Sequence, residues 1–227
     1  MEQEKIFRIS IEANDTINYA LHQNGTPLVS AIRIRNLTGV AKENLILRVR
    51  GESDILVPYE ESIPLIRGEE EVFISNPQIS IHGSVLAGFT EKIQFGLEVT
   101  IVKDEKIEVD EGPGIEKILA VSRKDITVLA YDEWPGARYY PELLAAFVMS
   151  NHPVIAELIK SASGWLEKWT GAPSLDGYQK NDPDRVKKMA AAVFAAIQEK
   201  NIVYAVPPAS FETLGQRVRL ADALERL

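Results

Sequence analysis

The chain has 227 residues, of which 45% are hydrophobic and 26% charged, and its formal net charge at pH 7 is -8. This length favours two domains, and the composition is that of an ordinary globular protein with enough apolar residues for a core. Cysteine is absent, which excludes disulfides, thiolate metal sites and a cysteine nucleophile within these residues. No apolar run could cross a bilayer and the amino terminus lacks a secretion profile, so we expect a cytoplasmic protein with no membrane partner.

The charge is distributed unevenly along the chain. Residues 1–130 carry 14 basic and 21 acidic side chains, and residues 131–227 carry 11 and 12. Proteins that bind the phosphate backbone of nucleic acids usually have a basic surplus. We therefore expect no direct nucleic-acid binding by this chain.

The first part of the chain has the two-residue period of half-buried β-strands. Leu45, Leu47 and Val49, for example, alternate with outward positions. The predicted strands are residues 6–12, 30–36, 44–51, 71–75, 92–102, 106–110 and 125–131. Turn formers such as Asn24-Gly25 and Gly112-Pro113-Gly114 separate them. The pattern predicts an antiparallel β-sandwich of immunoglobulin-like type over residues 1–132.

Residues 133–227 have a helical period and form the second predicted domain. The first helix has Pro141 in its first turn and one apolar face made of Leu143, Leu144, Phe147 and Val148. The second begins at Pro153 and is capped by Gly171, with the stripe Ile155, Leu158, Ile159, Ala162, Leu166 and Trp169. The third is capped by Asp182, with the stripe Val186, Met189, Ala190, Val193, Phe194 and Ile197. Residues 202–206 then predict a short strand and residues 220–227 the start of a helix.

For several residues that could have a functional role, a structural role is the favoured interpretation. His152, just ahead of a predicted helix, fits a packed or capping residue better than a metal ligand. Trp165 and Trp169 could form a binding platform, although core packing is the commoner role of such a pair. Arg217 and Arg219 could clamp an anion, or they could be the solvated face of an extended segment.

The junction YDEWPGARYY, residues 131–140, is short and aromatic. We expect Trp134, Tyr139 and Tyr140 to take part in packing between the two domains. No phosphate-binding loop is present, and Ser210 has no histidine near it in sequence to act as a base. We therefore expect no catalytic residue, cofactor site or metal site in this chain.

Two longer stretches, residues 131–153 and 177–220, resemble the N-terminal region of large bacterial proteins related to superfamily-one DNA helicases. These proteins carry a domain of unknown function ahead of the helicase motor and a restriction-endonuclease-like domain near the end. Residues 16–36 and 86–102, TINYALHQNGTPLVSAIRIRN and LAGFTEKIQFGLEVTIV, look like the β-rich opening of the same proteins. The resemblance covers nearly the whole chain and is more specific in the second half.

The resemblance implies that residues 133–227 are the truncated start of a transglutaminase-like α+β domain. In the family, a Gln-Arg-Val-Arg segment leads to a Gly-Thr-Cys and a later Gly-His, neither of which is in this chain. The positions that match the approach to that cysteine are Pro207, Pro208, Ser210, Phe211, Glu212, Gln216, Val218 and Arg219. With Arg217, the residues Ser210, Glu212, Gln216 and Arg219 form the candidate interaction or approach loop. ATP and magnesium would belong to helicase domains outside this sequence.

Three functional hypotheses follow. The first is a non-catalytic accessory region of a helicase-related multidomain protein that acts on DNA, with the rest of its own chain and an unidentified protein as partners. The second is the N-terminal half of a transglutaminase-like or papain-like cysteine hydrolase. The third is a stand-alone immunoglobulin-like binding module.

Overall fold

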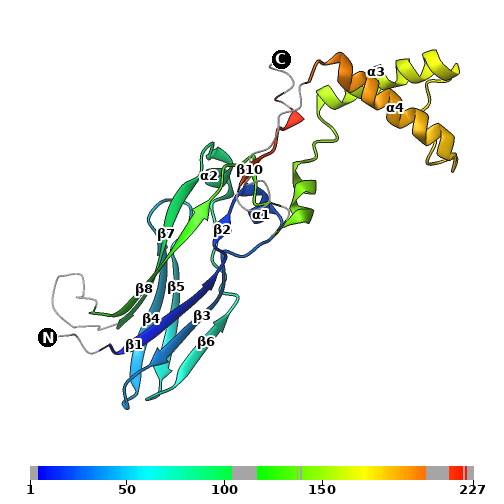
Figure 1. Ribbon diagram of the computed structural model, residues 1–227. Coiled ribbons are helices and arrows are strands. Elements are labelled where there is room, and N and C mark those ends of the chain that lie inside the picture. The colour runs from blue at the N-terminus through cyan, green and yellow to red at the C-terminus, as the bar shows by residue number, and fades with distance from the viewer. Residues whose placement is uncertain are drawn as a thin grey trace. The chain divides into compact units, whose positions relative to one another are not determined.

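The computed structural model describes residues 5–103, 117–136, 138, 140–202, 215–221 and 223 (Figure 1). The chain forms two compact units, Met1–Pro135 and Gly136–Leu227. The first consists mostly of antiparallel β-sheet, and helices dominate the described part of the second.

The first unit has two sheets. One has the strand order β1-β3-β6, built from β1 (Phe7–Ala13), β3 (Val29–Asn36) and β6 (Glu71–Ser75). The other has the order β2-β8-β7-β4-β5, built from β2 (Thr16–Ile17), β8 (Lys117–Val128), β7 (Ile93–Lys103), β4 (Lys42–Gly51) and β5 (Tyr59–Ile66). These pairings are antiparallel except that of β2 with β8.

The predicted period of two explains the core between the sheets. Leu45, Leu47 and Val49 of β4 are fully buried, as are Leu97 and Val99 of β7. One hydrophobic cluster contains residues of both sheets, and Ile32 and Ile34 of β3 belong to it from the three-stranded sheet. A sheet that buries one face and exposes the other alternates in this way, so the prediction of an antiparallel β-sandwich is confirmed.

The chain changes sheets directly after β1. The register of β1 against β3 shifts between Glu12 and Ala13, and Thr16–Ile17 then pair in parallel with Thr127–Val128 of the other sheet. A bulge of this kind bends a strand and ends its pairing. The start of the chain thus contributes β1 to one sheet and β2 to the other.

Several elements of the first unit, the two-residue strand β2 among them, were not predicted from the sequence. β5 contains Glu60, Glu61 and Pro64 in place of a regular apolar alternation, which an edge strand tolerates. The helices α1 (Tyr19–Gln23) and α2 (Gly83–Gly88) are too short to show a helical period. The predicted turn at Asn24-Gly25 ends α1, with Gly25 at a φ of 72°.

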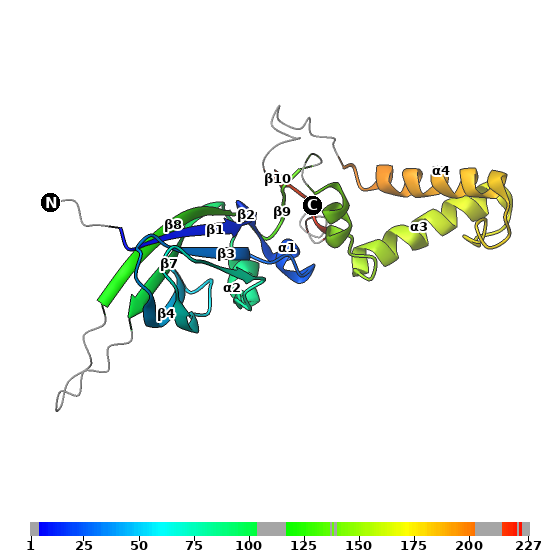
Figure 2. The same ribbon diagram turned by 90° about the horizontal axis from the view of Figure 1, so that it is seen from below.

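The second unit contains a 3-10 helix, η1 (Pro141–Phe147), and two long helices, α3 (Pro153–Thr170) and α4 (Pro183–Glu199). The long helices lie side by side as an antiparallel hairpin (Figure 2). Their predicted termini are confirmed: Gly171 caps α3 at a φ of 72°, and Asp182 accepts the backbone N–H groups of Asp184 and Arg185 at 3.1 and 3.0 Å. Two short strands, β9 (Glu133–Trp134) in the first unit and β10 (Gln216–Arg217) in the second, complete the elements.

The predicted apolar face over residues 141–148 is wrong. Leu143 is buried, whereas Leu144 and Val148 are exposed. In a 3-10 helix, residues three apart lie in one row, so Leu143 and Leu144 point in different directions. The predicted strand at 106–110, the turn Gly112-Pro113-Gly114, residues 203–206 of another predicted strand and most of the predicted helix at 220–227 lie outside the described residues.

Candidate functional site

The residues of the predicted approach loop fall partly outside the described residues. Ser210 and Glu212 do, together with the matching positions Pro207, Pro208 and Phe211. Gln216 is buried, and Arg217 and Arg219 are exposed. The alternation of buried and exposed positions is that of an extended segment with one solvated face.

Of the three residues predicted to pack between domains, Tyr139 lies outside the described residues. Trp134 is buried within β9, and Tyr140 is half-buried directly ahead of η1. The neighbour of Trp134 has a role that the sequence did not reveal. Glu133 is buried, its carboxylate accepts the N–H of Ala130 at 2.9 Å, and its carbonyl accepts Nδ2 of Asn18 at 2.6 Å.

Asn18 joins two segments of the first unit that are far apart in sequence. Its Oδ1 accepts the N–H of Leu21 at 2.8 Å, which caps α1, while its Nδ2 holds the Glu133 carbonyl. Asn18 is fully buried, so both ends of its amide are satisfied by protein groups. This side chain fixes the segment after β8 against the start of α1.

The exposed face of the larger sheet carries charges of both signs. A shallow depression is lined by Arg50, Glu52, Glu98, Arg123 and Asp125, and Arg123 pairs with Glu98 at 2.7 Å. Arg48 of β4 pairs with Glu60 of β5 at 2.6 Å. Cross-strand pairs of opposite charge stabilise a sheet modestly, which is sufficient to explain this arrangement. Within the described part of the chain, no group of three or more acidic, histidine or cysteine side chains could hold a metal ion.

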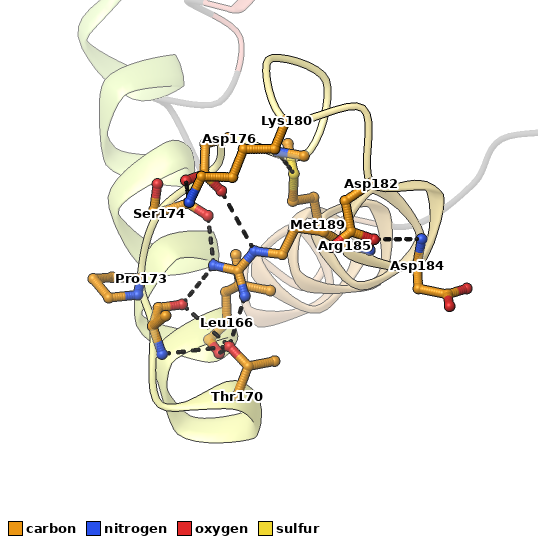
Figure 3. A network of polar contacts seen from close by, with 12 residues as sticks. Leu166, Thr170, Pro173, Ser174, Asp176, Lys180, Asp182, Asp184, Arg185 and Met189 are labelled. Carbon is orange, nitrogen blue, oxygen red and sulfur yellow. Dashed lines mark hydrogen bonds and ion pairs between the residues drawn. The ribbon is translucent and has the colours of Figure 1, made fainter.

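The loop of the α3–α4 hairpin is organised by one guanidinium group (Figure 3). Nη1 of Arg185 donates to Oγ1 of Thr170 at 2.8 Å, and Nη2 donates to the carbonyls of Ala172 at 2.7 Å and Ser174 at 2.5 Å. Nε lies 3.8 Å from Asp176, which also pairs with Lys180 at 2.6 Å. The Lys180 ammonium is the main cause that lowers the pKa of Asp176 below its usual range. These contacts of Arg185 lie within the hairpin, so the network fixes its loop.

Of the tryptophan pair, Trp165 packs against the hairpin core and Trp169 is 47% exposed. The Trp165 and Trp169 ring centroids are 5.5 Å apart, and Nε1 of Trp165 donates to Glu199 at 2.8 Å. Ser161 Oγ donates to the other oxygen of the same carboxylate, and Lys168 lies over the Trp165 ring at 4.7 Å. Trp165 therefore links α3 to the end of α4, which favours packing over a binding platform. His152 is also structural, because its Nδ1 accepts the N–H of Val154 at the start of α3.

The hairpin core is small and rests on alanines. Its buried residues are Ala162 and Leu166 of α3 and Ala192 and Ala196 of α4. Of the stripe predicted for α4, Met189 packs against this core and Val186 is half-buried, whereas Val193, Phe194 and Ile197 are exposed. Small side chains let the helix axes approach closely, so the neighbouring large residues are left outside the contact.

The result is an apolar surface on the second unit. Ile159 is 48% exposed, Val193 40%, Phe194 62% and Ile197 37%. We call these four residues the apolar hairpin face. Large apolar side chains grouped on one surface typically mark an interaction site. The sequence did not identify this face, because apolar residues at the same helical spacing would also be expected in a buried core.

No helix among the described residues is long and apolar enough to cross a membrane.

Comparison with known proteins gives little likeness. No family model matches the chain, and no curated protein matches it. Among solved structures, it is similar to a CARDB domain from Pyrococcus furiosus, determined by solution NMR, with 16% sequence identity and a TM-score of 0.33. That match covers 56% of this chain and 95% of the other.

Proposed function

We propose that this chain is a non-catalytic accessory region of a helicase-related multidomain protein that acts on DNA, and that it works by contacting other protein surfaces. The helicase context comes from the resemblance of residues 131–153 and 177–220. The role as a contact region is supported by the structure of the second unit.

The observation that carries the proposal is the apolar hairpin face. Ile159, Val193, Phe194 and Ile197 expose between 37% and 62% of their surface, while the hairpin buries mainly alanines and one leucine in its own core. A helix pair that serves only its own fold buries its largest apolar residues. This pair packs Leu158, Trp165 and Met189 against its core but leaves the four residues of the apolar hairpin face exposed, so these are available for another surface.

The resemblance assigns α3 and α4 to the first layer of a transglutaminase-like domain. Such a layer must pack against further structure, which agrees with an apolar face on the hairpin. ATP hydrolysis and the main DNA contacts belong in this proposal to other domains, because both halves of this chain carry more acidic than basic side chains.

The proposal is tested with the purified chain at a concentration low enough for monomers. We expect no ATP hydrolysis, no gel shift with duplex or single-stranded DNA, and clear fluorescence enhancement of anilinonaphthalene sulfonate. The enhancement should disappear in Val193→Ser/Phe194→Ser/Ile197→Ser and persist in the control Leu144→Ser, which alters an exposed leucine of η1. ATP hydrolysis, DNA binding or an absence of dye binding by the wild-type monomer would contradict the proposal.

A further inference from the structure

β6 is the outer strand of the smaller sheet. It pairs with β3 on one side, and none of the described strands pairs with its other side (Figure 1). Two backbone hydrogen bonds flank its ladder with β3. The N–H of Asn36 donates to the Glu70 carbonyl at 2.9 Å, just before β6. The N–H of Asn76 donates to the Ser30 carbonyl at 2.8 Å, just after β6. In an antiparallel pair every second residue exchanges such bonds, so the residues of β6 that bond to β3 are in step with Glu70 and Asn76.

This register leaves one row of backbone groups at the open edge. The even positions of β6, Val72 and Ile74, exchange hydrogen bonds with β3. The N–H and C=O groups of Glu71, Phe73 and Ser75 therefore point away from β3. Such a row is a template on which a further strand can pair.

The other sheet edges in the described part of the sandwich are protected against pairing. β5 contains Pro64, which cannot donate to a ladder. β1 has a bulge between Glu12 and Ala13, and Lys124 of β8 donates to the Ala13 carbonyl at 2.7 Å, so the end of β1 lies against β8. β2 has two residues. β6 has no proline, lysine or bulge, which are the devices that usually prevent edges from pairing.

The core is also open along β6. Ile32 and Ile34 of β3 are fully buried, at 0% exposure. Val72 and Ile74 lie opposite them in register and pack against the same cluster, but both remain half-buried. A strand added to β6 would place its own inward side chains beside these two residues and remove more apolar surface from water. The edge therefore offers an apolar contact as well as backbone hydrogen bonds.

The sequence of β6, EVFIS, has the same order of residue classes in both directions: polar, β-branched, aromatic, β-branched, polar. An antiparallel second copy with a two-fold axis at Phe73 would pair Phe73 with the same residue of that copy. Glu71 would then lie opposite Ser75 of the second copy, and Val72 opposite its Ile74 on the core side. Aromatic and aliphatic cross-strand pairs stabilise a sheet, and no like charges would face each other within the two strands.

The side chain at the centre of β6 fits this arrangement. Arg33 lies over the Phe73 ring at 4.4 Å from its centroid, and Glu12 holds Arg33 at 2.9 Å. Phe73 nevertheless remains 51% exposed. At a two-fold axis the two phenylalanine rings would cover each other, and such aromatic pairs contribute more than the area they bury.

We propose that β6 is a homodimer contact, in which two copies of this chain pair edge to edge through antiparallel β6 strands centred on Phe73. The three-stranded sheets of the two copies then form one continuous sheet. Each outward-facing residue of β6 shares two backbone hydrogen bonds with its partner in the second copy. This contact goes beyond the proposed function, which concerns the apolar hairpin face.

Sedimentation velocity of the whole chain from about 1 to about 100 µM tests the proposal. We expect a monomer–dimer equilibrium in this range. Phe73→Lys places two ammonium groups opposite each other at the two-fold axis and should weaken dimerisation at least about tenfold. Val121→Lys is the matched control, since Val121 is 49% exposed on β8 of the other sheet, and it should leave the equilibrium unchanged. Circular dichroism should show that both variants keep the wild-type fold.

Disulfide formation tests the register directly, since the native chain has no cysteine. An equimolar mixture of Glu71→Cys and Ser75→Cys should form a covalent heterodimer under mild oxidation, because the Cα atoms of paired residues lie about 5.5 Å apart. Each variant alone should crosslink far more slowly, because the same position in the two copies would be about 14 Å apart.

A monomer at every concentration, a dimer insensitive to Phe73→Lys, or equal crosslinking of the mixture and the single variants would overturn the inference. The outcomes also separate it from the proposed function. The variant Val193→Ser/Phe194→Ser/Ile197→Ser should dimerise like the wild-type chain. A dimer that is lost in this variant and kept in Phe73→Lys would assign association to the apolar hairpin face, so the β6 contact would fail and the proposed function would stand.

Discussion

Arg185 at the start of α4 and Thr170 at the end of α3 are joined side chain to side chain, Nη1 to Oγ1, at 2.8 Å. The same guanidinium donates to the carbonyls of Ala172 and Ser174, so one residue binds the end of α3 and two carbonyls of the connecting loop (Figure 3). The side chain is only 13% exposed. Hydrogen bonds of a shielded charged group are worth more than those at an open surface, so Arg185 determines how the two helices are connected.

Replacing Arg185 should therefore destabilise the hairpin. We expect Arg185→Ala to lower the free energy of unfolding of the second unit by about 3 kcal/mol, because it leaves loop carbonyls without donors. Arg185→Lys should recover little, since one ammonium cannot match a planar fork. Urea unfolding followed by circular dichroism measures this. Lys187→Ala, at an exposed neighbour, is the control and should cost less than about 0.5 kcal/mol. Equal effects at both positions would show that the network is unimportant.

Two glycines of the same hairpin should respond oppositely to alanine. A Cβ at Gly177 would lie 2.9 Å from both Met189 Sδ and Val186 N, whereas a Cβ at Gly164 would meet no atom within 4 Å. Gly177→Ala should destabilise by about 1 to 3 kcal/mol through overpacking. Gly164→Ala, in the middle of α3, should stabilise by up to about 1 kcal/mol through helix propensity. Thermal unfolding of the two variants provides the comparison. A Gly177→Ala variant as stable as the wild-type protein would contradict the close packing of Gly177 against α4.

The two roles of Asn18 can be separated by substitution. Asn18→Asp keeps the oxygen that caps α1 and loses the donor to the Glu133 carbonyl, whereas Asn18→Ala loses both. Both variants leave buried groups unsatisfied, at about 1 to 3 kcal/mol for each group. Hydrogen exchange should show faster opening around Glu133 in both variants and faster exchange of the Leu21 amide only in Asn18→Ala. Unchanged exchange near Glu133 in Asn18→Asp would contradict the link.

Tyr59 makes the sandwich sensitive to alkaline pH. Burial, followed by the hydrogen bond from its hydroxyl to Glu61 at 2.6 Å, raises the pKa of Tyr59 from 10.0 to about 12. The folded state favours the neutral phenol, so this contribution is fully present below pH 10 and is lost as the pH rises towards 12. Tyr59→Phe has no ionisable phenol, so its stability should decline less between pH 10 and pH 12 than that of the wild-type protein. Urea unfolding midpoints of both proteins at about pH 9 and about pH 11 test this expectation. An equal fall of the midpoint in both proteins would contradict the role of Tyr59.

Hydrophobic periodicity predicted the longer elements that bury one face in the core. β4, β6 and β7 alternate regularly because they pair along their length over the core, and the caps at Gly171 and Asp182 depend only on local residues. β5 was missed because an edge strand need not alternate. The predicted face of α4 was right at Met189 and wrong at Val193 and Phe194. Ala192 and Ala196 form the close contact there, and a hydrophobic pattern gives more weight to larger side chains.

The candidate site could be predicted less well than the fold. The approach loop was derived from the resemblance, and two of its residues, Ser210 and Glu212, lie outside the described residues. Asn18 and Glu133 are 115 positions apart, and no sequence period connects a capping asparagine with a distant carbonyl. In the sequence, the residues of the apolar hairpin face are apolar positions at helical spacing. Which of these positions are buried depends on how the neighbouring helix packs, and the spacing does not show this.

The most direct measurement is the fluorescence of anilinonaphthalene sulfonate with the monomeric chain, because it tests whether the apolar hairpin face is accessible. Val193, Phe194 and Ile197 are 40%, 62% and 37% exposed, and large exposed apolar side chains favour an interaction surface. The account predicts clear enhancement with the wild-type chain and its loss in Val193→Ser/Phe194→Ser/Ile197→Ser. No enhancement with the wild-type chain, or equal enhancement with both proteins, would contradict it.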